Sequence, residues 1–385
     1  MKALKEEFQN IYTNNNVAPS VFFAPGRVNL IGEHTDYNGG YVFPCALSFG
    51  THLLIRANHE NVVRLATTNF GYKAEIPLSD LHHKHGTEWV NYPLGVIDQF
   101  KKRGYAISGF DFLFSGDIPN GAGLSSSASI EIVTAIALDA MLGSDLKRVE
   151  LIKIGRAAEN EFVGMNCGIM DQFAIGMGKK EAALALNCRS LEFQHIPLHL
   201  GDYRIVVANT NKRRELADSK YNERVKECIT ALNYLRQAKP MVDLSAMSMA
   251  EFEQYSNLIP DDTIRRRARH VISENNRVIL AVDALLDEDL DTFGEQMNQS
   301  HISLQEDYEV TGFELDTIVN EAWQSEGVLG ARMTGAGFGG CSVNIVHKDK
   351  IDDFISRVGT NYTRITGLVP EFYIASIGNG AGKVE

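Results

Sequence analysis

Apolar and polar residues alternate in several short segments of the chain, and this alternation predicts β-strands. Residues 52–57 and 62–67 alternate in this way, as expected for strands with one buried face. Short apolar runs bounded by turn residues predict further strands by the same reasoning. These are expected at residues 20–24, 41–46, 110–114, 182–187, 203–209, 341–347 and 371–376.

Between these segments the apolar residues recur at the spacing of an amphipathic helix. In residues 89–102, for example, Val90, Leu94 and Ile97 fall on one helical face. Further helices are predicted at residues 125–142, 147–162, 168–177, 214–238, 264–286, 313–326 and 352–363. Interspersed strands and helices without an internal repeat indicate a mixed α and β protein.

The length of 385 residues exceeds the roughly 250–300 residues at which one hydrophobic core stops growing. We therefore expect two domains, residues 1–195 and 196–385, although no distinct linker marks the boundary. The apolar share of 44% and the charged share of 22% are those of an ordinary globular protein. This composition excludes a disordered or fibrous chain.

The chain is acidic, with 49 Asp and Glu against 37 Lys and Arg and a formal charge of −12. General nucleic-acid binding depends on phosphate neutralisation, and membrane surfaces are anionic, so we expect neither partner. Any phosphate must then be bound by a local site. The five cysteines include no CxxC pair, and no apolar signal-peptide segment is visible, so we expect reduced thiols and a cytoplasmic location.

The segment 116–129 is rich in glycine and serine and lies between a predicted strand and a predicted helix. Glycines let a backbone approach a ligand closely, and the free amides of a helix N-terminus bind anions. Ser125, Ser126 and Ser127 add hydroxyl groups, one of which could reach a Mg²⁺ ion. This segment matches neither the GxxxxGK[ST] nor the GxGxxG pattern, and a turn with a serine N-cap is the alternative.

The segment 25–40 brings Arg27, Glu33, His34 and Asp36 into one short loop between predicted strands. Carboxylates and imidazole suit a polyhydroxylated ligand, because each sugar hydroxyl both donates and accepts hydrogen bonds. The Glu-x-x-Asp spacing could instead hold a metal ion, and a solvated polar loop is the simplest alternative.

Residues 330–341 form a third motif, in which four glycines fall within six residues before a predicted strand. This density predicts a loop pressed against a ligand or another backbone, or else a tight turn required by packing. Glu159 lies near the end of one predicted helix, and Asp171 in the first turn of the next. The helix dipole stabilises a charged carboxylate at Asp171, which makes it available as a base; either acid could instead be an ordinary surface residue.

Taken together and in this order, the three motifs resemble those of the GHMP kinase superfamily. The loop 26–40 is similar to the signature of the members that phosphorylate galactose, and residues 168–172, 297–301 and 307–310 also resemble that branch. The resemblance implies an α+β fold in two domains, with the active site in the cleft between them. The N-terminal domain would be ribosomal-protein-S5-like and the C-terminal domain ferredoxin-like.

The resemblance also implies the reaction, in which the γ-phosphate of MgATP passes to the C1 hydroxyl of α-D-galactose. Asp171 would be the catalytic base, and Arg27 would lie beside it. The sugar would be bound by Glu33, His34, Thr35, Asp36, Gly168 and Tyr221. The ATP phosphates would be cradled by Gly121, Ala122, Gly123, Leu124, Ser125, Ser126 and Ser127, with Ser127 and Glu159 holding Mg²⁺.

On this view the partners are galactose and ATP, and the chain acts as a monomer. Two alternatives stay open: a kinase for N-acetylgalactosamine, and a non-catalytic galactose-sensing regulator. Regulators of that kind lack a Ser-Ala pair in the phosphate loop, whereas Ser127 and Ala128 are present here. Residues 38–40 resemble the galactose type. Thr67 and Thr68 are candidates for the adenine contact by position alone.

Overall fold

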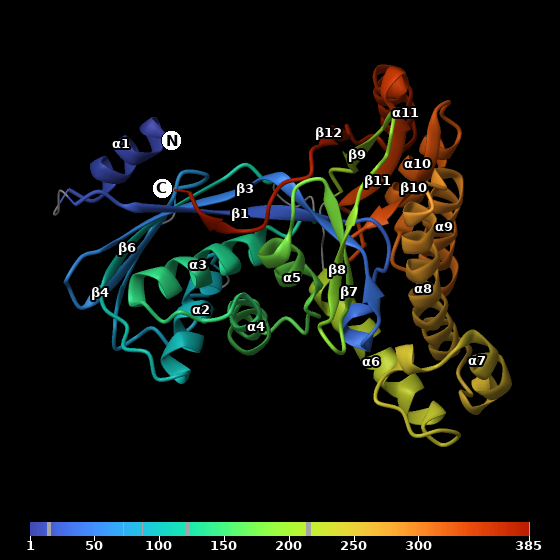
Figure 1. Cartoon of the computed structure of the whole chain (residues 1–385), viewed down its shortest axis with the longest axis horizontal. Helices are drawn as coiled ribbons and strands as arrows, with labels where there is room; N and C mark the ends of the chain where they lie inside the picture. The colour runs from blue at the N-terminus through green and yellow to red at the C-terminus, as the bar shows by residue number, and fades with distance from the viewer. Residues whose placement is uncertain (14–16, 72, 87, 120–122, 213–216, 385) are drawn as a thin grey trace.

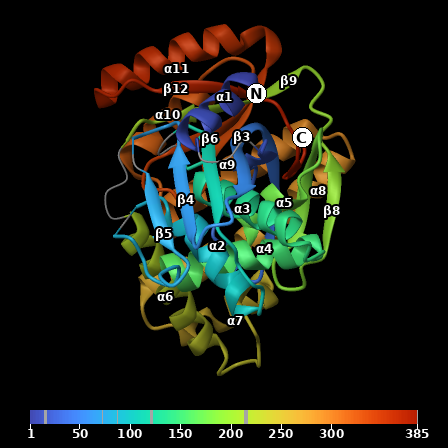
Figure 2. The same ribbon diagram turned by 90° about the vertical axis from the view of Figure 1, so that its left-hand side faces the viewer.

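The computed structural model describes the chain except for residues 14–16, 72, 87, 120–122, 213–216 and 385. Its N-terminal half is built on a six-stranded sheet in the order β13-β1-β3-β6-β4-β5. The pairs are antiparallel except for β4 and β6, which run parallel (Figure 2). The strands are β1 (Ser20–Asn29), β3 (Pro44–Ala57), β4 (Val62–Thr67), β5 (Ala74–Pro77), β6 (Phe110–Gly116) and β13 (Gly382–Lys383).

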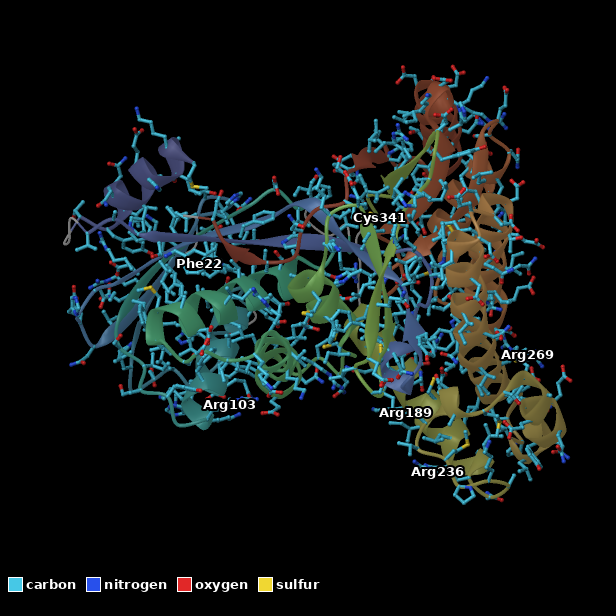
Figure 3. The ribbon with its side chains drawn as sticks, in the orientation of Figure 1. Phe22, Arg103, Arg189, Arg236, Arg269 and Cys341 are labelled. Carbon is cyan, nitrogen blue, oxygen red and sulfur yellow. The ribbon has the colours of Figure 1, made fainter. Side chains whose placement is uncertain are left out.

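Helices cover both faces of this sheet because its strands are apolar on both. Phe22 and Leu53 lie in the core beneath four helices, and Figure 3 shows Phe22 in the layer between β1 and α3. The next residues along, Val21 and Leu54, pack on the other face against Phe8 of the N-terminal helix. The helices are α1 (Lys2–Ile11), alone on its face, and α2 (Asn91–Lys102), α3 (Ser126–Leu142), α4 (Arg148–Ala157) and α5 (Met170–Met177) (Figure 1).

A second sheet, of four antiparallel strands in the order β10-β11-β9-β12, stands at the other end of the molecule (Figure 1). Along β9, Ile205 and Val207 pack on the side of α8 and α9, whereas Val206 and Ala208 pack against α10 and α11. The elements are β9 (Tyr203–Asn209), β10 (Val328–Thr334), β11 (Cys341–His347), β12 (Glu371–Ala375), α8 (Asp262–Leu286), α9 (Leu290–Ser303), α10 (Gly312–Trp323) and α11 (Ile351–Thr366).

A small sheet lies between the two halves, and further helices pack beside α8. A three-stranded sheet of β2 (Tyr41–Val42), β7 (Ala182–Asn187) and β8 (Phe193–Pro197) lies between the halves (Figure 1). The helices α6 (Ala217–Leu235) and α7 (Met249–Tyr255) pack beside α8. Short helices are η1 (Asp36–Asn38), η2 (Ala158–Val163), η3 (Leu244–Ala246), η4 (Ser256–Leu258), η5 (Leu304–Tyr308) and η6 (Lys348–Lys350). No helix in the described part of the chain combines the length and the apolar character required to cross a membrane.

Four strands have the predicted bounds, at 62–67, 182–187, 203–209 and 341–347. The predicted helix 147–162 is α-helical only as far as Ala157 and continues as the π-helix η2. The predicted strand 41–46 is wrong in its bounds, because the chain is divided there between β2 and β3. Residues 214–216, predicted as the start of a helix, lie outside the described residues, and α6 begins at Ala217.

The pattern missed α9 and β10 because their buried faces carry polar residues. Ser300 of α9 is buried, and its hydroxyl donates to Glu274 of α8. His301 is also buried and accepts a hydrogen bond from the backbone of Met333. Residues 330–334, predicted as part of a glycine-rich loop, belong to β10. The proposed domain boundary at residue 195 stays a prediction, and β13 at the end of the chain pairs with β1.

A buried arginine on β10 ties the C-terminal half to the first motif. The guanidinium of Arg332 lies 2.5 Å from Glu33 Oε2 and donates to the carbonyl oxygens of Asn29 and Leu30. Its Nε donates to Ser300 Oγ, 3.2 Å away. Arg332 and Glu33 are both essentially inaccessible to solvent. One cation therefore joins β10 and α9 to the end of β1 and the loop that follows it.

We expect Arg332→Met to lower the free energy of unfolding by about 3–5 kcal/mol, because a buried Glu33 would lose its ion-pair partner. Urea denaturation followed by circular dichroism measures this change. The exposed Arg357→Met is the matched control and should change the free energy of unfolding by less than about 0.5 kcal/mol. A loss below about 1 kcal/mol for Arg332→Met would show that this ion pair does not hold the two halves together.

Candidate active site

A cavity of about 240 Å³ lies where residues from all three motifs meet. Its wall is formed by the first motif, the N-terminus of α3, the segment before and at the start of α5, one residue of α6 and the two residues that follow β10. The predicted residues that line it are Arg27, Glu33, His34, Asp36, Gly123, Ser125, Ser126, Ser127, Glu159, Gly168, Asp171 and Tyr221. Segments that are far apart in sequence thus form one polar chamber.

Arg27 and Asp171 form a two-pronged ion pair in the wall of the cavity. Arg27 Nε donates to Asp171 Oδ1 and Arg27 Nη2 donates to Asp171 Oδ2, each at 2.8 Å. The remaining Nη1 donates to the carbonyl oxygen of Gly123, also at 2.8 Å. The Asp171 side chain is 30% exposed and the Arg27 side chain 5%. The carboxylate therefore faces the cavity, while the arginine holds it from behind.

Asp171 receives a further hydrogen bond from the phosphate loop. The Ser125 hydroxyl donates to Asp171 Oδ2. Ser125 precedes α3 with a left-handed backbone, φ 62°, and its side chain does not cap that helix. The alternative of a serine N-cap therefore does not hold at Ser125, because its hydroxyl donates to the Asp171 carboxylate instead. Asp171 itself lies in the first turn of α5, as predicted.

Asp36 and Gly168 fit against one another on the opposite wall. A Cβ added at Gly168 would lie far inside van der Waals contact with Asp36 Oδ2, so only glycine leaves room for that carboxylate. Burial, together with the charge of Asp171, raises the pKa of Asp36 to about 6. The close fit explains why a glycine precedes α5 at this position.

His34 presents an unpartnered ring nitrogen at the cavity. Its Nδ1 lies 3.0 Å from the Tyr37 hydroxyl, while Nε2 is buried and has no hydrogen-bond partner among the residues described. Burial, with the nearby His270, lowers the pKa of His34 well below its ordinary value, so the ring is neutral near pH 7. The Tyr221 ring packs beside it, with the ring centroids 5.6 Å apart.

Glu33 lines the cavity with a fully oriented carboxylate. Its Oε1 accepts from the Gly335 amide at 2.9 Å and lies 3.2 Å from Thr334 Oγ1. Its Oε2 accepts from Asn29 and pairs with Arg332. Burial raises the pKa of Glu33 above its ordinary value, and Arg332 opposes that shift.

Four predicted residues do not line the cavity or lie outside the described residues. Thr35 is buried behind the wall, and its hydroxyl lies within 2.8 Å of the carbonyl oxygens of Gly32 and Tyr41. Gly121 and Ala122 lie outside the described residues. Leu124 packs its side chain into the core, and its carbonyl oxygen accepts from the Arg27 amide.

Glu159 lies in the π-helix η2 at the same end of the cavity as Ser127. Burial and the charge of Asp171 raise its pKa to about 7, while hydrogen bonds from Cys167, Ser127 and Gln172 act in the opposite direction. The Gln172 amide nitrogen lies 2.6 Å from Glu159 Oε2, and Cys167 Sγ lies 3.4 Å from it. Three donors therefore hold this carboxylate in place.

The oxygen donors of Ser127 and Glu159 fit a magnesium ion. Within the described ranges, no group of three or more His, Cys, Asp or Glu side chains could hold a metal ion. Mg²⁺ needs fewer protein ligands, because it is usually held by one or two carboxylates together with substrate phosphates and water. A carboxylate beside a hydroxyl, next to a helix N-terminus that suits phosphate, meets this requirement.

A second cavity of about 160 Å³ adjoins the first and shares Ser126 and Ser127 with it. Its wall is aromatic, and the predicted Thr67 lines it, whereas Thr68 does not. Buried Trp89 Nε1 has no hydrogen-bond partner in the part of the chain that the structure describes. The aromatic lining residues are Phe70, Trp89, Tyr92 and Phe114. Sequence reasoning missed them because Trp89 and Tyr92 fit an ordinary amphipathic helix.

The third motif supplies one edge of the first cavity and a backbone contact. Gly335 and Ala336 line the cavity. Gly337, with φ 79°, lies against the carbonyl of Val310, where a Cβ would clash. Its glycines are thus pressed against other backbone on one side and the cavity on the other, which agrees with the prediction.

Comparison with known proteins agrees with this geometry. Residues 91–179 match the family model described as GHMP kinases N terminal domain, and residues 281–364 match GHMP kinases C terminal. Residues 6–57 match the galactokinase galactose-binding signature. A galactokinase of Clostridium acetobutylicum is 52% identical over 99% of this chain and 98% of its own length. A galactokinase of Bacillus subtilis is 48% identical over 99% of this chain and its entire length.

Solved structures agree with the same assignment. The galactokinase of Lactococcus lactis, crystallised with galactose, has a TM-score of 0.97 and 44% identity, covering 100% of this chain and 99% of its own. The mevalonate kinase of Methanococcus jannaschii has a TM-score of 0.66 at 21% identity over 95% of this chain and all of its own, a likeness of fold alone. The predicted GHMP-kinase-like α+β fold is confirmed. The chain belongs to the galactokinase family of the GHMP kinases.

Proposed function

We propose that this ATP-dependent sugar kinase transfers the γ-phosphate of ATP to the C1 hydroxyl of α-D-galactose, giving galactose 1-phosphate and ADP. The observation that carries the proposal is the Asp171 carboxylate, held by Arg27 and exposed to a cavity between the galactose signature and the α3 N-terminus. A base, a cation and an anion-binding helix end meet there at hydrogen-bonding range, as phosphoryl transfer requires.

The sugar occupies the end of the cavity formed by the first motif. His34 and Tyr221 offer a ring nitrogen and a hydroxyl, and Glu33 and Asp36 offer carboxylates. This mixture of donors and acceptors suits adjacent sugar hydroxyls, each of which donates one hydrogen bond and accepts others. Gly168 supplies backbone beside Asp36, and Thr35 supports the loop from behind.

Asp171 accepts the proton of the C1 hydroxyl as the oxygen attacks the γ-phosphorus. The new bond joins C1 oxygen to phosphorus, and the bond from that phosphorus to the bridging oxygen of ADP breaks. Arg27 keeps the carboxylate oriented and neutralises charge on the transferring group. The proton then leaves Asp171 for solvent.

The nucleotide spans both cavities. The α3 N-terminus with Ser126 and Ser127 binds the phosphates, because both serines line both cavities and a helix N-terminus favours anions. The nucleoside lies among the aromatic residues around Trp89. Ser127 and Glu159 hold Mg²⁺, which when bound neutralises charge on the phosphates.

The direct test is ADP release from MgATP with galactose, glucose, N-acetylgalactosamine or no acceptor in parallel. We expect turnover on galactose and background rates otherwise. Asp171→Asn should then lower kcat by about 10²–10⁴-fold, as loss of a general base does. The exposed Asp202→Asn is the matched control. Turnover on N-acetylgalactosamine alone would contradict the sugar, and near-normal kcat in Asp171→Asn would contradict the base.

The fit between Gly168 and Asp36 predicts a selective defect. Gly168→Ala should raise KM for galactose by about tenfold or more, because the added methyl displaces the Asp36 carboxylate. KM for ATP should stay within about twofold, since neither residue lines the second cavity. Gly382→Ala is the control, because nothing lies within 4 Å of its added Cβ. Equal changes in both KM values would argue against a sugar subsite at Gly168.

The aromatic cavity predicts the opposite selectivity. Trp89→Leu should raise KM for ATP by about tenfold, since stacking of a base on an aromatic ring contributes about 1–3 kcal/mol. KM for galactose should be unchanged within about twofold. Trp323→Phe, which lines neither cavity, is the matched control. If Trp89→Leu raised only KM for galactose, the nucleoside would have to lie elsewhere.

A further inference from the structure

Gln172 follows Asp171 in the first turn of α5, is fully buried and lines neither cavity. Its amide nitrogen donates to Glu159 Oε2 at 2.6 Å and to Glu131 Oε2 at 3.0 Å. An amide group has two N–H bonds, so both are given to carboxylates. The reverse orientation would place the amide oxygen against these two carboxyl groups and would give neither of them an N–H donor from the amide.

The second carboxylate lies on the phosphate-binding helix. Glu131 of α3 follows Ser127 by four residues, so the two side chains share one helical face. Ser127 bonds to Glu159 directly, and Glu131 reaches it through Gln172. The helix that binds phosphates, the π-helix η2 and the base-bearing helix α5 are thus linked through one amide.

Glu131 acts as an anchor for this amide rather than as a competing ligand. It is fully buried, and burial, with the nearby Glu159, raises its pKa well above its ordinary value. Its Oε2 accepts one N–H of the Gln172 amide, and this hydrogen bond fixes the amide against Glu159.

We propose that Gln172 is a positioning residue for the metal-binding carboxylate. By holding Glu159 against Ser127, it sets the affinity of the ATP site for Mg²⁺ without contacting either substrate. The inference rests on the proposed function for the assignment of Mg²⁺ to Ser127 and Glu159, and its fluorescence test also for the placement of the nucleoside beside Trp89. Removal of a residue that hydrogen-bonds to a metal ligand typically lowers metal affinity or activity by about 10–100-fold.

The test measures binding rather than turnover. The chain has two tryptophans, so Trp323→Phe leaves Trp89 in the aromatic cavity as the only fluorescent indole. ATP is added at a fixed concentration, and Mg²⁺ is titrated while Trp89 fluorescence is recorded. In this background Gln172→Met, similar in size but without a donor, should raise the half-saturating Mg²⁺ concentration by about 10–100-fold. KM for galactose at saturating Mg²⁺ should stay within about twofold.

The π-helix offers a matched control of the same chemistry. Gln99 donates to Glu161 Oε2 at 2.7 Å, on the same π-helix, but neither residue lines a cavity near the site. Gln99→Met removes an equivalent Gln–Glu hydrogen bond and should leave the Mg²⁺ titration unchanged. Glu131→Gln keeps an acceptor for Gln172 and should also titrate as the parent does, whereas Glu131→Leu should weaken Mg²⁺ binding.

Several outcomes would overturn the inference. One is a Mg²⁺ titration of Gln172→Met within twofold of the parent, and another is an equal shift in Gln99→Met. If Gln172→Met does not fold, Gln172→Asn carries the same expectation, because its shorter side chain cannot reach both carboxylates. The titration contains no galactose, so it is independent of the sugar. A parent that phosphorylates no galactose but shows the Gln172-dependent shift would refute the proposed function and support this positioning role.

Discussion

The arrangement of the site depends on one buried guanidinium that has to be paired. Arg27 is buried near the end of β1, where the strand register shifts between Pro25 and Arg27. A buried arginine without hydrogen-bond partners would destabilise the fold. The groups that accept hydrogen bonds from its guanidinium are therefore held in place. They are given to both oxygens of Asp171 and to the Gly123 carbonyl. A strand, the glycine- and serine-rich loop before α3 and the first turn of α5 are thereby held at hydrogen-bonding distance, and the cavity forms among them.

That pairing leaves the cavity with an excess of acids. Asp171 is paired with Arg27 and Glu33 with Arg332. Asp36 and Glu159 also line the cavity, and burial and the Asp171 charge raise their pKa values to about 6 and about 7. A further carboxyl group, that of Glu131, lies on the far side of Gln172 from Glu159. Raised acid pKa values in one cavity mark a place where negative charge is under-compensated. Such a place favours a bound cation. The negatively charged phosphates of a nucleotide would be repelled by these acids unless a cation bound between them. The local charge balance therefore supports the assignment of Mg²⁺ and is independent of the overall charge of −12.

The sequence predicted those parts of the site that are local in the chain. The candidate side chains of the first motif, except Thr35, and the three serines before and at the start of α3 lie within short segments, and they do line the cavity. The pairing of Arg27 with Asp171 spans 144 positions, and only the family resemblance suggested it. Trp89 and Gln172 were missed because each fits the expected pattern of a helix, and their partners are defined by packing. In the same way β10 was taken for loop because its central residue, Arg332, is charged yet buried among groups remote in sequence.

The non-glycine residues with a left-handed backbone fall into two groups, one buried and one exposed or half-buried. Of the ten described non-glycine residues with positive φ, the two that are buried are His34 and Ser125, and both line the cavity. The other eight are exposed or half-buried, so few neighbouring groups pack against the backbone at these positions. A left-handed L-residue costs about 1–2 kcal/mol, so a buried example persists only where its surroundings hold it. At His34 the left-handed backbone brings the ring to the cavity wall, and at Ser125 it brings the hydroxyl to the Asp171 carboxylate. Glu159 lies in a π-helix, a rare conformation that occurs frequently at functional sites. All three residues line the same cavity, so these costly backbone conformations are concentrated at the candidate site.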